Sequence, residues 1–263
     1  FGHAFTKLAL ETMGESKIRI FSRGEYAQHL MKQRFAEHAD RLTWIIGDIR
    51  DQRRLERAMW KADAVVHAAA LKQVPILEEN PFEAVETNVQ GTRNVIECAI
   101  DSGVKVNLLV SSDKGVSPRN VYGATKMLAE RVWAQSSSYA GGRGGLSFVA
   151  VRYGNVIGSR GSVVQVWRRQ IESSGKLTIT DPNSTRFVLT PMKAAQVAMA
   201  AIETAQDGEV VVPMLPSCKV SELALAVDER ADWDVTGMRP GEKLHEEMIP
   251  EAELEFTRKD ATA

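Results

Sequence analysis

Short apolar runs alternate with helix-length stretches along the first 155 residues, and this alternation limits the fold more than any other feature of the sequence. Parallel strands need long crossover connections, usually helices, so the pattern predicts an α/β fold with a doubly wound parallel sheet covered on both faces. The expected strands are Lys17–Ser22, Leu42–Gly47, Ala64–Ala68, Lys105–Ser111 and Ser147–Tyr153. The expected helices are Ala4–Met13, Glu25–Phe35, Arg53–Trp60, Pro81–Ser102 and Val121–Gln135.

The alternation weakens after Asn155. Two further helices are expected, and only short strands lie between them. The sequence therefore predicts one domain over residues 1–155 and a smaller, partly interwoven lobe over residues 156–263. The expected helices of this lobe are Val163–Ser173 and Met192–Thr204, and its strands are Leu177–Thr180 and Glu209–Pro213.

The chain opens on Phe1 and Gly2 and enters a helix directly. In a Rossmann-like, dinucleotide-binding fold, a strand and a glycine-rich turn precede such a helix. Gly2 fits the last glycine of that turn, so we expect the first strand and the earlier glycines to be missing. The alternative is a fold that never had this strand, which would remove the middle of the sheet.

The composition is that of an ordinary globular protein, with 44% hydrophobic and 25% charged residues. The formal net charge of −1 gives no general attraction to nucleic acid or to an anionic membrane, so neither is expected as a partner. The two cysteines form no zinc or disulfide pattern, no metal is predicted, and Cys98 fits a buried thiol. Without an apolar stretch of about 18 residues or a signal peptide, we expect a cytoplasmic protein.

Tyr122 and Lys126 are spaced i, i+4 at the start of an expected helix, so both side chains share one face. A nearby ammonium lowers the pKa of a tyrosine, and the phenolate can then act as a base towards a sugar hydroxyl. Asp113 and Lys114 follow an apolar strand, at the edge where α/β enzymes place their sites. The alternative for Tyr122 and Lys126 is an ordinary surface pair. The alternative for Asp113 and Lys114 is a solvated turn with an ion pair.

Three other strand ends carry candidate cofactor residues. Ser22 and Arg23 end the second strand of the expected fold, where an arginine can bind a 2′-phosphate; NADP is therefore expected in preference to NAD. Asp48 ends the next strand and fits an adenine contact, or else a helix cap. His67 fits a core histidine, and the alanines 68–70 after it would either admit a flat cofactor or serve tight packing.

The second half of the chain offers cations for a diphosphate. Arg186 and Arg239 lie in polar surroundings, and arginine binds phosphate in a bidentate geometry. Each could also be an ordinary surface charge.

Together these residues resemble the extended short-chain dehydrogenase/reductases, and more narrowly their polysaccharide-biosynthesis branch. The match is closest to the inverting UDP-N-acetylglucosamine 4,6-dehydratases and covers nearly the whole chain. The runs SSDKGVSPRNVYGATK and GMRPGEKLHEEMI are the most specific. Retaining sugar dehydratases have a loop similar to Thr-Asp-Glu where this chain has Ser112, Asp113 and Lys114.

The resemblance implies a dehydratase that binds NADP and a UDP-sugar. Tyr122 would take the C4 hydroxyl proton, Lys114 the C5 proton, and Asp113 would help the C6 hydroxyl leave before C5 is inverted. The implied catalytic residues are Asp113, Lys114, Tyr122 and Lys126. The implied cofactor residues are Gly2, Ser22, Arg23, Asp48, Ile49, Ala68, Ala69, Ala70, Lys72, Tyr122 and Lys126. The implied substrate residues are Lys72, Ser112, Asn155, Arg186, Arg239 and Glu242.

Other features follow from the same resemblance. Asn88 matches a structural and proton-relay asparagine, and a homo-oligomer is expected through helices such as Pro81–Ser102 and Val121–Gln135. The chain departs from the family's pattern at Gly24, Gln73 and Gln165. Two other functions remain open: a UDP-sugar 4- or 5-epimerase of the same family, and a non-catalytic cofactor-binding protein.

Overall fold

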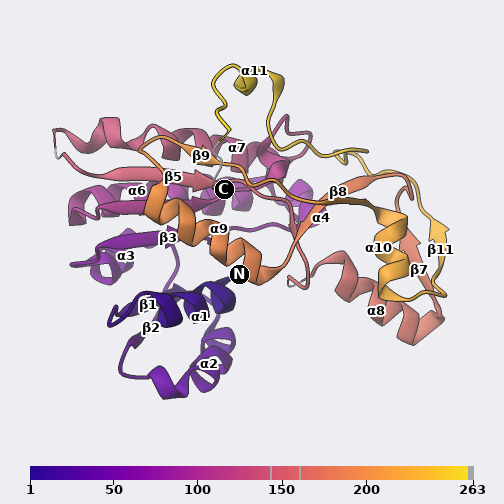
Figure 1. Ribbon diagram of the computed structural model, residues 1–263, viewed down its shortest axis with the longest axis horizontal. Coiled ribbons are helices and arrows are strands. Elements are labelled where there is room, and N and C mark those ends of the chain that lie inside the picture. The colour runs from indigo at the N-terminus through magenta and orange to yellow at the C-terminus, as the bar shows by residue number, and fades with distance from the viewer. Residues whose placement is uncertain (143, 160, 260–263) are drawn as a thin grey trace.

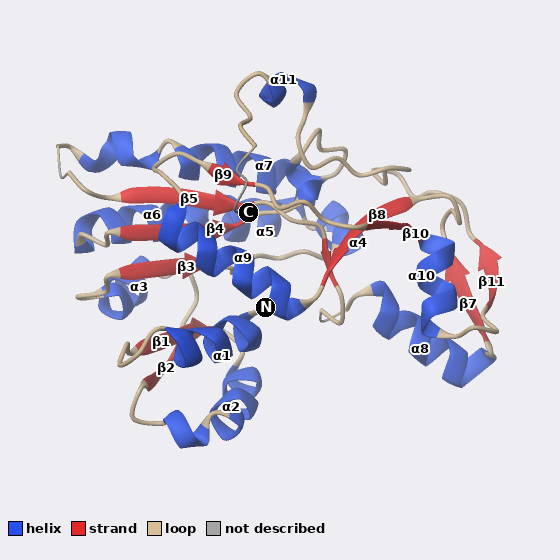
Figure 2. Ribbon diagram, in the orientation of Figure 1, coloured by secondary structure: helices blue, strands red, loops and turns tan. Residues whose placement is uncertain are grey.

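The protein is built around a parallel sheet with the order β3-β4-β5-β9. The computed structural model describes residues 1–142, 144–159 and 161–259 (Figure 1). The four strands are β3 (Ala64–His67), β4 (Val106–Val110), β5 (Ser147–Val151) and β9 (Val210–Val211). A second parallel pair, β1 (Ile18–Ser22) with β2 (Leu42–Ile46), lies near β3 but is not hydrogen-bonded to it within the described residues (Figure 2).

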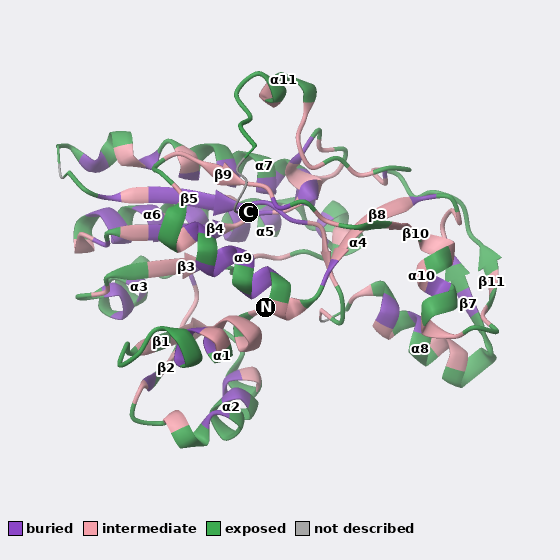
Figure 3. Cartoon of the chain, viewed as in Figure 1, coloured by how far each residue is buried: buried purple, intermediate pink, exposed green. Residues whose placement is uncertain are grey.

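Helices cover both faces of the four-stranded sheet, as the alternation predicts. One face carries α3 (Gln52–Met59), α6 (Gly91–Ser102) and α7 (Val121–Ala134), and the other carries α9 (Pro191–Thr204). Successive residues of a strand point to opposite faces. Leu109 and Phe148 therefore join the core under α6 and α7, while their neighbours Leu108 and Val149 pack beneath α9. Figure 3 shows that β5 is buried along most of its length.

The remaining helices of the first half lie around this sheet. α1 (Gly2–Thr12) packs on α9, and α2 (Glu25–Arg34) contacts β1 and β2. The doubly wound α/β class is confirmed. The expected strand and glycine-rich turn before α1 stay a prediction.

The long helix expected over Pro81–Ser102 is interrupted. It consists of α5 (Pro81–Ala84), a π-helical segment over Val85–Gln90 and then α6, while a short helix α4 (Val74–Glu79) precedes it. The wider turn of the π segment contains Asn88, whose side chain bonds to both the amide and the carbonyl of Leu71. A β-carbon at position 91 would lie 2.5 Å from Ile49 Cδ1, so a larger residue where α6 begins would require the Ile49 side chain to move.

A smaller group of elements follows Tyr153 (Figure 1), and the division into two domains at residue 155 stays a prediction. Its first sheet contains β6 (Asn155–Val156), β8 (Thr185–Leu189) and β10 (Ser217–Lys219); its second pairs β7 (Lys176–Ile179) with β11 (Asp232–Val235). Helices α8 (Val163–Ser174) and α10 (Val220–Val227) pack against β7 around Trp167 and Leu177. Because α9 and β9 return to the main sheet, the two parts are interwoven. The chain ends beyond α11 (Glu251–Leu254).

Two expectations from composition can be compared with the structure. Cys98 is fully buried against the main sheet, and burial raises the pKa of its thiol to about 12. Among the described residues, no helix has the length and apolar character needed to span a bilayer. The cytoplasmic location itself stays a prediction.

His67, at the end of β3, makes stability depend on pH. The ring is 4% exposed, contacts Thr92 Oγ1 through Nε2 at 3.0 Å, and has a pKa lowered from 6.5 to about 3 by burial and by the charge of Lys126. The unfolded chain takes up a proton below pH 6.5 and the folded chain does not, so stability falls as the pH drops. We expect this group to make the free energy of unfolding about 2 kcal/mol lower at pH 5 than at neutral pH.

Urea unfolding at pH 7 and pH 5 measures this loss. His67→Gln has no titrating side chain and is expected to show a smaller difference between the two pH values. An equal pH dependence in both proteins would contradict the role of His67.

Candidate active site

A buried carboxylate stands where the chain leaves β4. Asp113 begins a single 3-10 turn, Asp113–Gly115, and has no exposed surface. Ser112 precedes this turn: its hydroxyl donates to Asp113 Oδ1 at 2.8 Å and accepts from the backbone amide of Lys114. The other oxygen of Asp113, Oδ2, is buried and has no hydrogen-bond partner in the described structure. A carboxylate held this way retains a free acceptor for one more proton.

Lys114 reaches back over the same turn. Its ammonium donates to Asp113 Oδ1 at 3.0 Å and to Asn155 Oδ1 at 2.8 Å, and its side chain is 25% exposed. Burial alone would lower the pKa of Lys114, but the nearby carboxylates of Asp113 and Glu246 outweigh it and raise the pKa above its usual 10.5. The sequence neighbours Asp113 and Lys114 therefore form an ion pair that Asn155, from β6, completes.

Tyr122 joins this cluster from the first turn of α7. Asn120 caps the helix by accepting from the amide of Gly123 at 2.8 Å. The loop comes so close that a β-carbon at position 123 would lie 2.3 Å from the carbonyl oxygen of Lys114, so only glycine fits there. The Tyr122 ring packs against Leu77 and is 8% exposed, and the nearby Ser112 side chain is one of the groups that oppose the effect of burial on the pKa of its phenol. The phenol thus faces the Asp113 turn.

The expected effect of Lys126 on Tyr122 is not what the structure shows. Lys126 is 5% exposed and its ammonium donates to the carbonyl of Val110 at 2.7 Å; burial lowers its pKa to about 8. The pKa of Tyr122 is raised, because burial outweighs the opposing effect of Lys114. The i, i+4 spacing placed both side chains on one face, but the cation that stabilises the phenolate is Lys114.

The candidate adenosine residues lie at the ends of β1 and β2. Arg23 Nη1 is 3.5 Å from Asp48 Oδ2, which binds Arg50 more closely at 2.8 Å. Ser22 Oγ accepts from Gln28. Asp48 does not cap the next helix, because Asp51 does so by accepting from the Arg54 amide.

Ile49 stays a predicted cofactor residue, but only through its backbone. Its side chain is 7% exposed within the main core and its carbonyl accepts from Asn94 Nδ2. Only its backbone remains near the strand end, so its side chain is not a ligand contact.

Small residues leave the end of β3 open. Ala68 and Ala69 are exposed, Ala70 is half-buried, and none has a side chain that blocks the strand end. Gly2 stands at the amino end of α1 with no atom near its missing side chain. These positions, together with the exposed cation Arg23, fit a dinucleotide cofactor lying across the carboxyl ends of parallel strands. Lys72, next along the chain, contacts Ser159 Oγ at 3.2 Å.

The candidate substrate residues of the second half lie on β8 and on the segment after β11. Arg186 Nη1 donates to the carbonyls of Thr185 and Leu244. Arg239 and Glu242 contact each other, the backbone amide of Arg239 donating to Glu242 Oε2 at 3.2 Å. Since Leu244 belongs to the segment that crosses the Asp113 turn, Arg186 is linked to the catalytic cluster through this segment.

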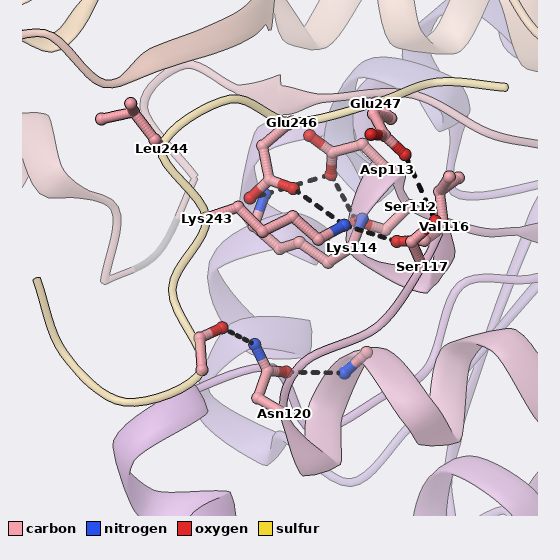
Figure 4. A network of polar contacts seen from close by, with 12 residues as sticks. Ser112, Asp113, Lys114, Val116, Ser117, Asn120, Lys243, Leu244, Glu246 and Glu247 are labelled. Carbon is pink, nitrogen blue, oxygen red and sulfur yellow. Dashed lines mark hydrogen bonds and ion pairs between the residues drawn. The ribbon is translucent and has the colours of Figure 1, made fainter. Parts of the chain in front are cut away.

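Two charged residues of the cluster are not among the expected site residues. Glu246 Oε1 lies 4.0 Å from Lys114 Nζ, and Lys243 Nζ lies 3.6 Å from Glu246 Oε2 (Figure 4). Both belong to the run GMRPGEKLHEEMI, for which only Arg239 and Glu242 had been assigned roles. The i, i+3 spacing of Lys243 and Glu246 was the available signal, but it does not say which face of the segment turns inward.

The doubly wound sheet and the Tyr-x-x-x-Lys helix beside it define a short-chain dehydrogenase/reductase of the extended type. More narrowly, the chain belongs to the polysaccharide biosynthesis protein family, whose model matches residues 1–262. It is 40% identical to the inverting UDP-N-acetylglucosamine 4,6-dehydratase of Campylobacter jejuni, over 98% of this chain and 76% of that protein. It is also 36% identical to a UDP-glucose 4-epimerase of Rickettsia felis, over 97% and 76% of the respective chains.

Solved structures show the same fold. Pen from Bacillus thuringiensis superposes with a TM-score of 0.90 at 36% identity, covering 96% of this chain and 80% of that one. DesIV, the dTDP-glucose 4,6-dehydratase of Streptomyces venezuelae solved with NAD bound, gives a TM-score of 0.84 at 22% identity, covering 99% and 89%. The second likeness extends to the fold alone.

Proposed function

We propose that the protein is an inverting UDP-N-acetylglucosamine 4,6-dehydratase that uses NADP. The observation that carries this proposal is the cluster after β4, in which Lys114 contacts both Asp113 and Asn155 while the Tyr122 hydroxyl meets Ser112. One carboxylate, one amine and one phenol are the acid and base groups that dehydration with C4 oxidation needs. The 40% identity to a relative with this name supports the same reading.

Each residue of the cluster has a proton to hold or move. Tyr122 would accept the C4 hydroxyl proton, assisted by the charge of Lys114 and by the nearby Ser112 hydroxyl. Transfer of a proton from Lys114 to Asp113 across their 3.0 Å contact would leave a neutral amine and a carboxylic acid. The amine would then remove the C5 proton as the acid protonates the leaving C6 hydroxyl, which departs as water.

The cofactor would lie across the ends of β1, β2 and β3. Arg23 would meet a 2′-phosphate, the Ala68–Ala70 backbone would allow close approach, and Lys126, now bonded to the Val110 carbonyl, would turn to a ribose hydroxyl. When bound, the nicotinamide would accept the C4 hydride and later return it to C6, while a proton that exchanges with solvent would reach C5 on the face opposite Lys114 and invert that centre. The cation at the end of β1 is the reason to expect NADP rather than NAD.

The nucleotide-sugar would be held by the lobe over residues 156–263. Arg186 and Arg239 would bind the diphosphate, with Glu242 orienting Arg239, and Ser112, Asn155 and Lys72 would contact the sugar. A homo-oligomer through α5 and α7 is proposed as well, because both helices expose apolar side chains. These are Phe82, Met127, Leu128 and Val132.

Product analysis tests the reaction. The protein is incubated with UDP-N-acetylglucosamine and NADP in deuterated water, and the product is examined by mass spectrometry and NMR. We expect a 4-keto-6-deoxy sugar that has lost one water, carries deuterium at C5 and has the inverted C5 configuration. An isomer of unchanged mass would instead identify the epimerase that the Rickettsia relative suggests, and binding of NADP without turnover would identify a non-catalytic protein.

A further inference from the structure

The segment 241–247 is fastened across the loop that carries Asp113 and Lys114 (Figure 4). Asn120 Nδ2 donates to the Gly241 carbonyl at 2.9 Å, Lys243 donates to the carbonyl of Val116, and Ser117 Oγ donates to Glu247 Oε2 at 3.2 Å. These contacts are distributed along the segment. The position of Glu246 between them is therefore fixed by the fold.

Glu246 is turned into the cluster between two lysines. Its side chain is 7% exposed, with Oε1 4.0 Å from Lys114 Nζ and Oε2 3.6 Å from Lys243 Nζ. Oε2 is buried and accepts no hydrogen bond in the described structure. A buried carboxylate without hydrogen bonds is costly, so a purely structural role would more readily be filled by an apolar residue of similar size.

We propose that Glu246 is a positioning residue of this site, which orients the ammonium group of Lys114 and sets the pH range in which Lys114 can accept a proton. The proposal rests on the proposed function for its effect on turnover. Its effect on Lys114 itself does not depend on which reaction the site catalyses.

The groups that face Lys114 come from four parts of the chain. Asp113 shares its turn, Tyr122 comes from α7, Asn155 from β6, and Glu246 from the segment after β11. Burial lowers the pKa of Lys114, whereas Asp113 and then Glu246 raise it. Lys243, on the far side of Glu246, offsets part of that carboxylate's charge. Glu246 is therefore the carboxylate that can be replaced to change the pKa of Lys114, because Asp113 is needed as the acid.

Glu246→Gln tests the proposal with the side chain's shape retained. Loss of the negative charge makes the Lys114 ammonium less stable, so Lys114 releases its proton at a lower pH. The mechanism needs the one proton that Lys114 and Asp113 share, so kcat falls when this proton is lost at high pH, and we expect that falling alkaline limb to move down by about 1 pH unit. Glu246→Asp keeps the charge and should restore the limb most of the way, and Glu247→Gln, the same change at the exposed neighbour, should leave the limb in place.

A second measurement follows the deprotonation of Lys114 in the absence of turnover. Competitive acetylation across a pH series, followed by mass spectrometry of the peptide with Lys114, gives the pH at which this amine becomes reactive. In folded Glu246→Gln protein we expect the same downward shift; an unchanged value would overturn the proposal. If that variant does not fold, Glu246→Met, an uncharged side chain of similar length, is labelled instead, and the absence of any shift there has the same meaning.

The two proposals fail in different ways. A wild-type protein that yields no 4-keto-6-deoxy product refutes the proposed function, while a labelling shift in Glu246→Gln would still support the link between Glu246 and Lys114. A wild-type protein that yields this product, with the same limb and labelling in Glu246→Gln, refutes the role of Glu246 alone.

Discussion

Replacing Tyr122 with phenylalanine is expected to lower kcat several hundred-fold or more, the scale set by loss of a positioned base. The substitution removes one oxygen and leaves the ring packed against Leu77. What is lost is the hydroxyl near Ser112 and Lys114 that would accept the C4 hydroxyl proton. Initial rates of keto-sugar formation under saturating substrate measure the effect, since the loss is expected in kcat more than in KM.

Tyr153→Phe is the matched control. Tyr153 is 4% exposed, and its hydroxyl is buried without a hydrogen-bond partner among the described residues, so the same atom is removed from a neighbouring tyrosine. We expect its turnover to stay within about 3-fold of wild type, in line with a group that stabilises no reacting charge. Near-normal activity in Tyr122→Phe would refute the catalytic assignment of Tyr122.

Much of the fold could be predicted because β4 and β5 are buried on both faces. A strand with this environment is apolar at successive positions, as Leu108 and Leu109 are, and is therefore visible in the sequence. Strands β6 and β10 have two and three residues, too few for any periodicity, and were missed. The π segment was missed as well; it contains Asn88, whose contact with Leu71 is a tertiary feature that local spacing does not report.

The site, too, could be predicted from the sequence only in part. The pairing of Asp113 with Lys114 is local, so adjacency after an apolar strand was enough to suggest it. Glu246 approaches Lys114 only because the segment after β11 is fastened across the loop, and no sequence spacing reports such a contact. The spacing of Tyr122 and Lys126 predicted a shared face but not that Lys126 turns to the Val110 carbonyl, since this depends on where β4 ends.

Replacing Lys114 with methionine is expected to abolish deuterium incorporation at C5 and to lower dehydration by about 1,000-fold, within the range for loss of a general base. Methionine matches the length of the aliphatic stem but offers no amine to take the C5 proton. C4 oxidation would lose the charge of Lys114 that assists Tyr122, but it would keep Tyr122 itself, which takes the C4 hydroxyl proton. Slow formation of reduced nicotinamide, followed by its absorbance, should therefore persist while water loss stops.

The control must separate a base from a mere counter-charge for Asp113, because removing one partner of a buried ion pair itself costs about 3–5 kcal/mol. Lys114→Arg does so: guanidinium retains the positive charge beside Asp113, yet it does not lose its proton in a protein. We expect Lys114→Arg to recover the thermal stability lost in Lys114→Met without recovering C5 exchange. If C5 exchange continued in either variant, Lys114 would not be the base, and the proton would have to leave to another group of the cluster. If Lys114→Arg restored both stability and exchange, the ammonium of Lys114 would act only through its charge.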